Sequence, residues 1–179
     1  MKRSLFVAVL AGIALVSLSF EARAQLSTVA KPVQIGVALG AAIPSSDLSD
    51  ISNTGYNGTI TVGFNPAMVP FGIRVDGAYN QFSVKDILGS GNIHFTSVTG
   101  NLVYKIPGAT VSPYGIGGAG WYQVGGTGIS SESHFGWNIG GGISMPLSGF
   151  DVFIEGRYNQ VQGNNGSLKF IPVTFGVMF

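Results

Sequence analysis

From residue 33 onward, the sequence alternates between large apolar side chains and small or polar ones, the period-two pattern of β-strands. The alternation is clearest at residues 33–43, 71–83, 135–145 and 150–160, with Phe153 as an exception on the polar face. Weaker alternation predicts four more strands, at residues 56–64, 93–105, 111–124 and 168–179. No segment of this part shows a convincing 3.6-residue apolar period, so we predict eight strands and no helix.

The contrast between the two faces of each strand indicates which face points outward. An eight-stranded barrel has an interior just wide enough for side chains or one small ligand. Five or six bulky side chains per strand would crowd that space, whereas Gly, Ala, Ser and a few charges fit. The bulky face must then point outward, where only lipid accepts it. The sequence therefore predicts an all-β fold, an eight-stranded antiparallel up-and-down transmembrane β-barrel over residues 33–179.

Connection lengths alternate along the chain and predict the orientation. Short connections are expected at residues 65–70, 106–110 and 146–149, and mostly longer ones at residues 44–55, 84–92, 125–134 and 161–167. Outer-membrane barrels have short periplasmic turns and longer external loops, so both termini should be periplasmic. Aromatic girdles are expected at both rims. We place Phe64, Phe71, Tyr104, Phe150 and Phe179 at the periplasmic rim, and Tyr56, Tyr79, Tyr122, Trp137 and Tyr158 at the outer rim.

The first 24 residues have the layout of a secretory signal peptide. Lys2 and Arg3 precede an apolar stretch, and Ala22 and Ala24 flank Arg23 in a small-x-small cleavage pattern. We predict cleavage between Ala24 and Gln25, followed by a short periplasmic segment at residues 25–32. The alternative, a membrane anchor helix, is less favoured because the apolar stretch is short for a bilayer span.

Composition supports a membrane barrel and excludes some functions. Charged residues make up 9% of the chain, against about 25% in a typical soluble domain. Without residues 1–24 the chain holds six Lys/Arg and seven Asp/Glu, which leaves no basic surface for nucleic acid. The chain has no cysteine, and therefore no disulfide framework.

Four segments carry a resemblance to a known family: Ser-Pro-Tyr-Gly-Ile-Gly-Gly-Ala-Gly at 112–120, Phe-Gly-Trp-Asn-Ile-Gly-Gly-Gly-Ile at 135–143, and residues 152–158 and 171–179. With them the chain resembles the small OmpA/OmpX-type outer-membrane β-barrel family. The resemblance implies contact with outer-membrane lipid, a monomer, and recognition by the outer-membrane assembly machinery. The assembly signal would be the closing alternation of Val173, Phe175, Val177 and Phe179. Larger relatives add a peptidoglycan-binding domain, which we do not expect here.

Four charged residues are predicted to lie inside the barrel. By parity Arg74, Asp76, Glu155 and Arg157 all face inward, and their strands, the third and the seventh, oppose each other across a closed ring of eight. We expect a network of Arg–carboxylate pairs in the lumen. The network can be interpreted as a gated or selective pore or as a polar plug, and we favour the plug because eight-strand interiors are usually filled by side chains.

Other motifs do not support a catalytic, cofactor or metal site. Gly115-x-Gly117-x-x-Gly120 matches a dinucleotide-binding pattern, but a strand rather than a helix is expected after it. Residues 130–134 contain serine, glutamate and His134, but they fall in a Gly/Ser-rich predicted loop, and a nucleophile needs a fixed geometry with its base. His94 and His134 lack further clustered metal ligands. We therefore expect no catalytic residue, no cofactor and no metal.

The favoured function is a non-enzymatic integral outer-membrane barrel with a role in envelope structure and surface contacts through its outer loops. Residues 44–55 and 125–134 are the expected contact points, since function concentrates on loops. The ligand of these loops is not identified by the sequence. Two alternatives stay open, a narrow pore for small solutes and a barrel enzyme that modifies lipid A.

Overall fold

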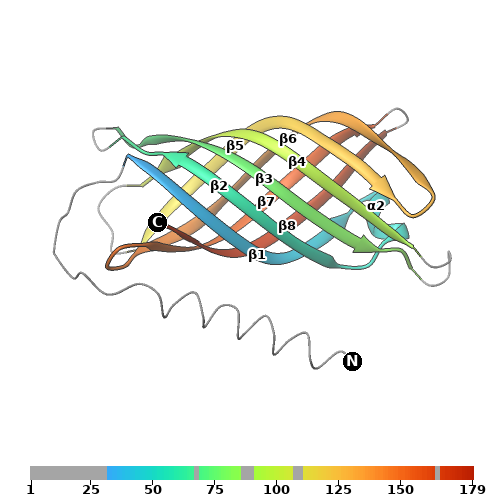
Figure 1. The fold of residues 1–179 in the computed structure, drawn as a ribbon, viewed down its shortest axis with the longest axis horizontal. Coiled ribbons are helices and arrows are strands. Elements are labelled where there is room, and N and C mark those ends of the chain that lie inside the picture. The colour runs from blue at the N-terminus through green and yellow to red at the C-terminus, as the bar shows by residue number, and fades with distance from the viewer. Residues whose placement is uncertain (1–31, 67–68, 86–90, 107–110, 164–165) are drawn as a thin grey trace, which may run out of the picture.

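The chain forms a closed barrel of eight antiparallel strands (Figure 1). The computed structural model describes residues 32–66, 69–85, 91–106, 111–163 and 166–179. The strands are β1 (Val33–Ser45), β2 (Gly55–Phe64), β3 (Phe71–Ser83), β4 (Asn92–Lys105), β5 (Ser112–Gly126), β6 (Ile129–Pro146), β7 (Asp151–Gly163) and β8 (Gly166–Met178). Each strand pairs with the next, and β8 pairs with β1, which confirms the predicted up-and-down topology.

Most of the large apolar side chains point away from the barrel axis, as predicted, although several phenylalanines point into the lumen. Ile60, Ile139 and Phe175, for example, are each more than half exposed, whereas the neighbouring Thr61 and Asn138 are buried. Successive side chains of a strand alternate between its two faces, so closing the sheet sends every second residue into the lumen. The outer surface is therefore an apolar belt, and the lumen holds most of the polar side chains.

Aromatic side chains lie toward both ends of the outer wall. At one end the Phe71 and Tyr104 rings lie 5.1 Å apart, and at the other the Trp137 and Tyr158 rings lie 5.7 Å apart. The prediction for Tyr122 was wrong. This side chain is 1% exposed and lies inside the barrel, because even positions of β5 face inward.

The start of β1 and the end of β8 lie at the same end of the barrel as the three connections after β2, β4 and β6 (Figure 1). The opposite end differs from the sequence-based prediction in two ways. Residues 125–134 are mostly strand rather than loop, with Thr127 and Gly128 forming the tip of a hairpin in which Gly128 has a φ of 76°. Strands β7 and β8 likewise extend into most of the predicted connection at residues 161–167.

The second difference is a short helix, α2 (Asp47–Ile51), between β1 and β2. The sequence predicted no helix because five residues are too few to show a 3.6-residue period. Among the described residues, no helix has the length and apolar character needed to cross a bilayer. The predicted signal peptide, with its cleavage site at Ala24 and Gln25, lies outside the described residues.

Candidate functional site: the barrel lumen

Four charged side chains form a closed ring of ion pairs in the middle of the lumen. Arg74 Nη2 lies 2.8 Å from both carboxylate oxygens of Glu155, and Arg157 Nη2 lies 2.7 Å from Asp76 Oδ2. Ion pairs within each strand complete the ring, because Arg74 Nε lies 3.1 Å from Asp76 Oδ1 and Arg157 Nε contacts Glu155. Each of the four groups, which were predicted from parity to face inward, therefore contacts two groups of opposite charge.

The order of the charges along the two strands explains the ring. Strand β3 reads Arg74-x-Asp76 and β7 reads Glu155-x-Arg157, the same spacing with the signs reversed. All odd-numbered strands of an up-and-down barrel run in the same direction. The reversed order therefore places Arg74 opposite Glu155 and Asp76 opposite Arg157 across the lumen. The spacing of two also keeps both charges of each strand on its inner face.

Neutral side chains complete the hydrogen bonding of the ring. Tyr114 donates its hydroxyl to Glu155 Oε2 at 2.9 Å, Asn101 Nδ2 donates to Asp76 Oδ2 at 2.9 Å, and Thr61 also donates to Asp76. The Arg74 guanidinium lies 5.8 Å from the centre of the Phe153 ring, a distance at which cation–π attraction operates. The two carboxylates are almost fully shielded from solvent, so their charges depend on these partners.

The neutral members of this cluster were not predicted from the sequence. Tyr114, Asn101 and Thr61 were not singled out, although their parity within β5, β4 and β2 places them on the inner faces. The signal was weak in β5, because glycine occupies both faces of that strand. Phe153, noted as an exception to the outward apolar pattern, is buried in the lumen, which is what its parity requires.

Two small cavities lie on either side of the ring. The larger one, about 30 Å³, has mostly hydroxyl, amide and charged side chains in its wall, among them Ser97, Thr99 and Asn159. The smaller one, about 20 Å³, lies on the side of Tyr114, Lys105 and Asp151. Arg74 and Phe153 line both cavities and so separate them. Cavities of this size hold a few water molecules at most.

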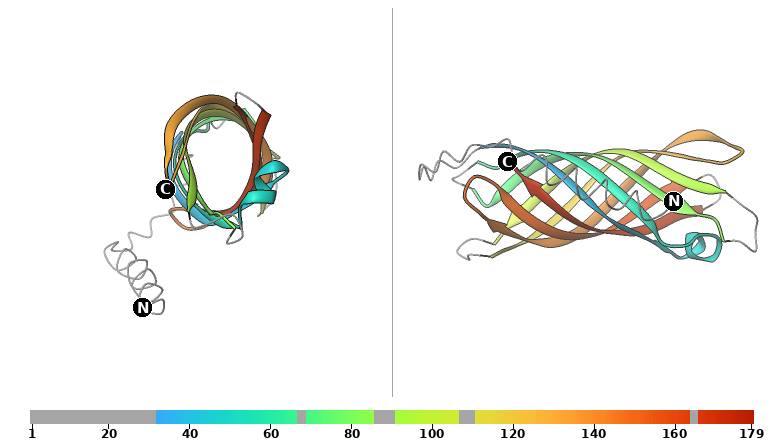
Figure 2. Two further views of the ribbon diagram at one scale, coloured as in Figure 1. Left: turned by 90° about the vertical axis from the view of Figure 1, so that its right-hand side faces the viewer. Right: turned by 60° about the horizontal axis from the view of Figure 1, so that its bottom comes forward.

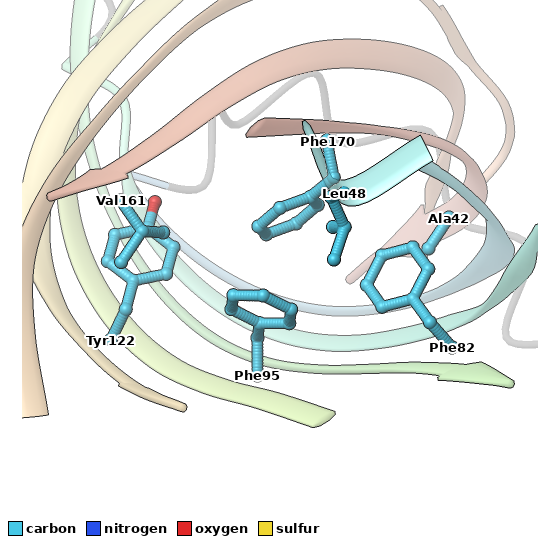
Figure 3. Close-up of a cluster of buried hydrophobic side chains, with 7 residues drawn as sticks. All are labelled: Ala42, Leu48, Phe82, Phe95, Tyr122, Val161 and Phe170. Atoms are coloured by element: carbon cyan, nitrogen blue, oxygen red, sulfur yellow. The ribbon is translucent and has the colours of Figure 1, made fainter. Parts of the chain in front are cut away.

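An apolar cluster fills the end of the lumen nearest α2 (Figure 3). The rings of Phe82, Phe95 and Phe170 lie 4.9–5.7 Å apart, and each of these side chains is at most 1% exposed. Leu48 of α2 inserts among them and is fully buried. The remaining members are Ala42, Tyr122 and Val161. The cluster adjoins the larger cavity, because Tyr122 and Phe170 belong to both, and the hydroxyl of Tyr122 donates to Asn159 Oδ1 at 2.9 Å on the cavity side.

The remaining sequence-derived candidates have no contact with the ring of ion pairs among the described residues. His134 Nε2 is 3.5 Å from the exposed Glu132, and the His94 ring stacks on Tyr79. Within the described ranges, no group of three or more histidine, cysteine, aspartate or glutamate side chains is placed to hold a metal ion. The closing residues Val173, Phe175, Val177 and Phe179 all face outward, and their role as an assembly signal stays a prediction.

Comparisons with known proteins agree with this architecture. The profile of the family described as outer membrane protein beta-barrel domain matches residues 9–179. No curated protein sequence matches the chain. Among solved structures, Neisserial surface protein A is similar with a TM-score of 0.67 and 19% identity, covering 82% of this chain and 96% of that one.

Two further solved structures share the fold. Ail, the attachment invasion locus protein of Yersinia pestis, solved with the heparin analogue sucrose octasulfate, has a TM-score of 0.50 and 21% identity, with 82% of this chain and 99% of that one covered. The outer membrane enzyme PagL has a TM-score of 0.52 and 15% identity, with 80% and 97% covered. At these identities the similarity concerns the fold alone.

Proposed function

The chain belongs to the outer membrane protein beta-barrel domain family, and from this premise we propose that it is a non-enzymatic structural barrel of the outer membrane. One observation carries the proposal: an apolar outer wall surrounds a lumen that is occupied by the apolar cluster and the ring of ion pairs and retains only small cavities beside the ring. The wall provides the surface that lipid requires. The filled lumen leaves envelope structure, rather than transport, as the function that the geometry supports best.

The content of the lumen argues against a narrow pore. A solute would have to pass the apolar cluster around Phe82, Phe95 and Phe170, and then the ring between Arg74 and Glu155. Displacing the ring would leave desolvated charges without partners, which is costly. We infer that the ring acts as a polar plug that satisfies its own charges.

Lipid-A modification is the less supported alternative. The fold is shared with the enzyme PagL, but a catalytic site needs a nucleophile held by its base. His134 lies beside the exposed carboxylate of Glu132, but no serine hydroxyl among the described side chains is hydrogen-bonded to it. We therefore place no catalytic role on the segment that contains His134.

The proposal extends to orientation and partners. We assign the end with the short connections and the two chain ends to the periplasm, as short periplasmic turns are the rule for such barrels. The β5–β6 hairpin and α2 then face the outside and are the surfaces available for contact with other molecules. We further propose that the barrel is a monomer, inserted by the outer-membrane assembly machinery with Val173, Phe175, Val177 and Phe179 as its signal.

Electrophoresis of detergent-folded protein, unheated and boiled, followed by planar-bilayer recording, tests the proposal. We expect the unheated protein to migrate as a compact band that shifts on boiling, and to give no stable conductance. Protein unfolded in urea and added to the same bilayer is the matched control. Stable, large conductance would contradict the structural role and show that the protein is a pore.

Mass spectrometry of lipid A from cells with and without the protein tests the enzyme alternative. We expect identical spectra, and a difference would favour the enzyme.

A further inference from the structure

Helix α2 lies at the rim of one barrel mouth and sends one side chain into the lumen (Figure 2, left; Figure 3). The helix packs against β1 and β8. Leu48 is fully buried in the apolar cluster, whereas Ile51 of the same helix is 38% exposed. Burial of a leucine side chain contributes about 2 kcal/mol. The position of the helix therefore depends strongly on this one side chain.

The backbone that leads into α2 is strained. Ser46 has a φ of 52° and a ψ of −138°, a conformation that glycine adopts readily and other residues rarely do. The side chain of Ser46 makes no capping hydrogen bond to the helix. Such strain persists only where surrounding contacts impose it. The insertion of Leu48, two residues later, is a contact that can impose it.

The exit from α2 is joined to the end of β3 and to the two residues after it, and the Asn53 backbone N–H donates to the Ser83 carbonyl at 2.9 Å. Ser52 forms a single bridge with Val84, and the Lys85 backbone N–H donates to the Ile51 carbonyl at 3.0 Å. The Ser52 hydroxyl is buried, and no group of the described residues hydrogen-bonds to it. An unsatisfied buried hydroxyl is a cost of the closed position that exposure to water would remove.

Below Leu48 and the three phenylalanines lies the larger polar cavity, which includes Ser97 and Thr99 in its wall. We propose that residues 46–52 form a lid with Leu48 as its stopper, and that this lid opens while the barrel wall stays intact. Opening relaxes Ser46, hydrates Ser52 and gives water and small polar solutes access to the cavity from this mouth. The inference concerns one end of the lumen and holds whichever side of the membrane that end faces.

A cysteine reporter in the cavity tests the lid, because the chain has no native cysteine. Ser97→Cys places a thiol in the cavity wall, and Asn53→Cys places one on the exposed surface next to the lid. Detergent-folded protein is treated with iodoacetamide, and alkylation is followed by mass spectrometry. We expect Ser97→Cys to react at least about tenfold more slowly than Asn53→Cys. Adding Leu48→Ala should speed the Ser97→Cys reaction by about tenfold or more, since truncating a buried leucine removes most of its packing.

Two matched controls separate lid opening from a loosened barrel. Ile51→Ala makes a comparable aliphatic truncation on the exposed face of the same helix and should change the rate by less than about twofold. Ser144→Cys reports on the smaller cavity beyond the ring, and its rate should not respond to Leu48→Ala. Equal acceleration at Ser97→Cys and Ser144→Cys would overturn the proposal, as would an unchanged Ser97→Cys rate in folded Leu48→Ala protein. If Leu48→Ala does not fold, Leu48→Val carries the same comparison with a smaller acceleration.

Discussion

At the scale of single residues, the central feature of this barrel is a ring of charges that are largely shielded from water. Each charge of the central ring contacts two opposite charges, so the four side chains satisfy one another. Replacing a whole buried ion pair by apolar groups is often neutral, whereas removing one partner leaves an uncompensated charge and is costly. The ring is therefore evidence of mutual dependence rather than of a large net contribution to stability.

Glu155→Gln tests that dependence. Glu155 accepts from Arg74, Arg157 and Tyr114, so the neutral amide removes half of the negative charge of the ring while keeping the shape of the side chain. We expect the free energy of unfolding to fall by about 3 kcal/mol, measured by urea titration of detergent-folded protein. Glu132→Gln, the same change at an exposed carboxylate, should shift it by less than about 0.5 kcal/mol. Equal effects of the two substitutions would contradict the ring as a mutually dependent unit.

Ser46→Gly tests the strain at the entrance of the lid. Glycine adopts the backbone conformation of Ser46 without the steric cost, so the closed position should gain about 1 kcal/mol. The alkylation rate of the Ser97→Cys reporter should then fall about fivefold. Ser49→Gly makes the same change inside α2, where glycine weakens a helix, and should raise the rate instead. A faster reaction in Ser46→Gly would show that the strain does not act on the lid.

At the scale of the strand, the odd or even position of a residue predicted, in most cases, which face of the barrel wall its side chain occupies. The face of a strand residue is fixed by its parity, so Arg74, Asp76, Glu155 and Arg157 could be placed inside before any contact was known. Helix α2 could not be predicted in this way, because its position depends on one leucine. Leu48 packs against side chains from strands that are distant in the sequence. The β5–β6 hairpin was predicted to be a loop because it is rich in glycine and serine, which are typical of loops. The same residues also occur in strands that extend beyond the lipid-facing wall, where no large apolar side chains are needed.

Strand β5 offers a matched pair of glycines with opposite expectations. A side chain at Gly120 would point inward against the backbone of β4, where its Cβ would lie 2.7 Å from the Cα of Thr99. A Cβ at Gly115 would point outward and meet nothing within 4 Å. Gly120→Ala should therefore lower the free energy of unfolding by at least about 2 kcal/mol, through displacement of packed backbone. Gly115→Ala should leave it unchanged or raise it by about 0.5 kcal/mol, since alanine restricts the unfolded chain.

Urea titration of the two variants side by side checks this pair. Both substitutions add the same methyl group to the same strand, so differences in strand propensity cancel. Similar loss of stability in both variants would mean that β5 tolerates no side chain on either face, and would contradict the assignment of Gly115 to the open outer wall.

At the scale of the whole molecule, the usual distribution of polar and apolar groups is reversed around most of the wall. The ion pairs, amides and hydroxyls lie inside, and large apolar side chains form the outer surface from Val33 to Phe179. The low content of charged residues follows from this arrangement, because a lipid-facing wall excludes charge and a narrow lumen has room for little of it. Charged side chains can face solvent at the ends of the barrel, and the exposed carboxylates of Asp47, Asp50 and Glu132 lie at one end.

A charge scan along β2 tests whether lipid covers this wall. Ile60, in the middle of the strand, is 64% exposed, and Tyr56, near its end, is 55% exposed, so in water both sites would accept arginine with little cost. In a bilayer the cost depends on depth, about 2–4 kcal/mol at the midplane and about 0–1 kcal/mol near the interface. Folding into lipid vesicles, followed by urea titration, should therefore show a large loss of stability for Ile60→Arg and a small one for Tyr56→Arg. Equal, small effects at the two depths would mean that water rather than acyl chains surrounds the barrel, and the outer-membrane function would have to be abandoned.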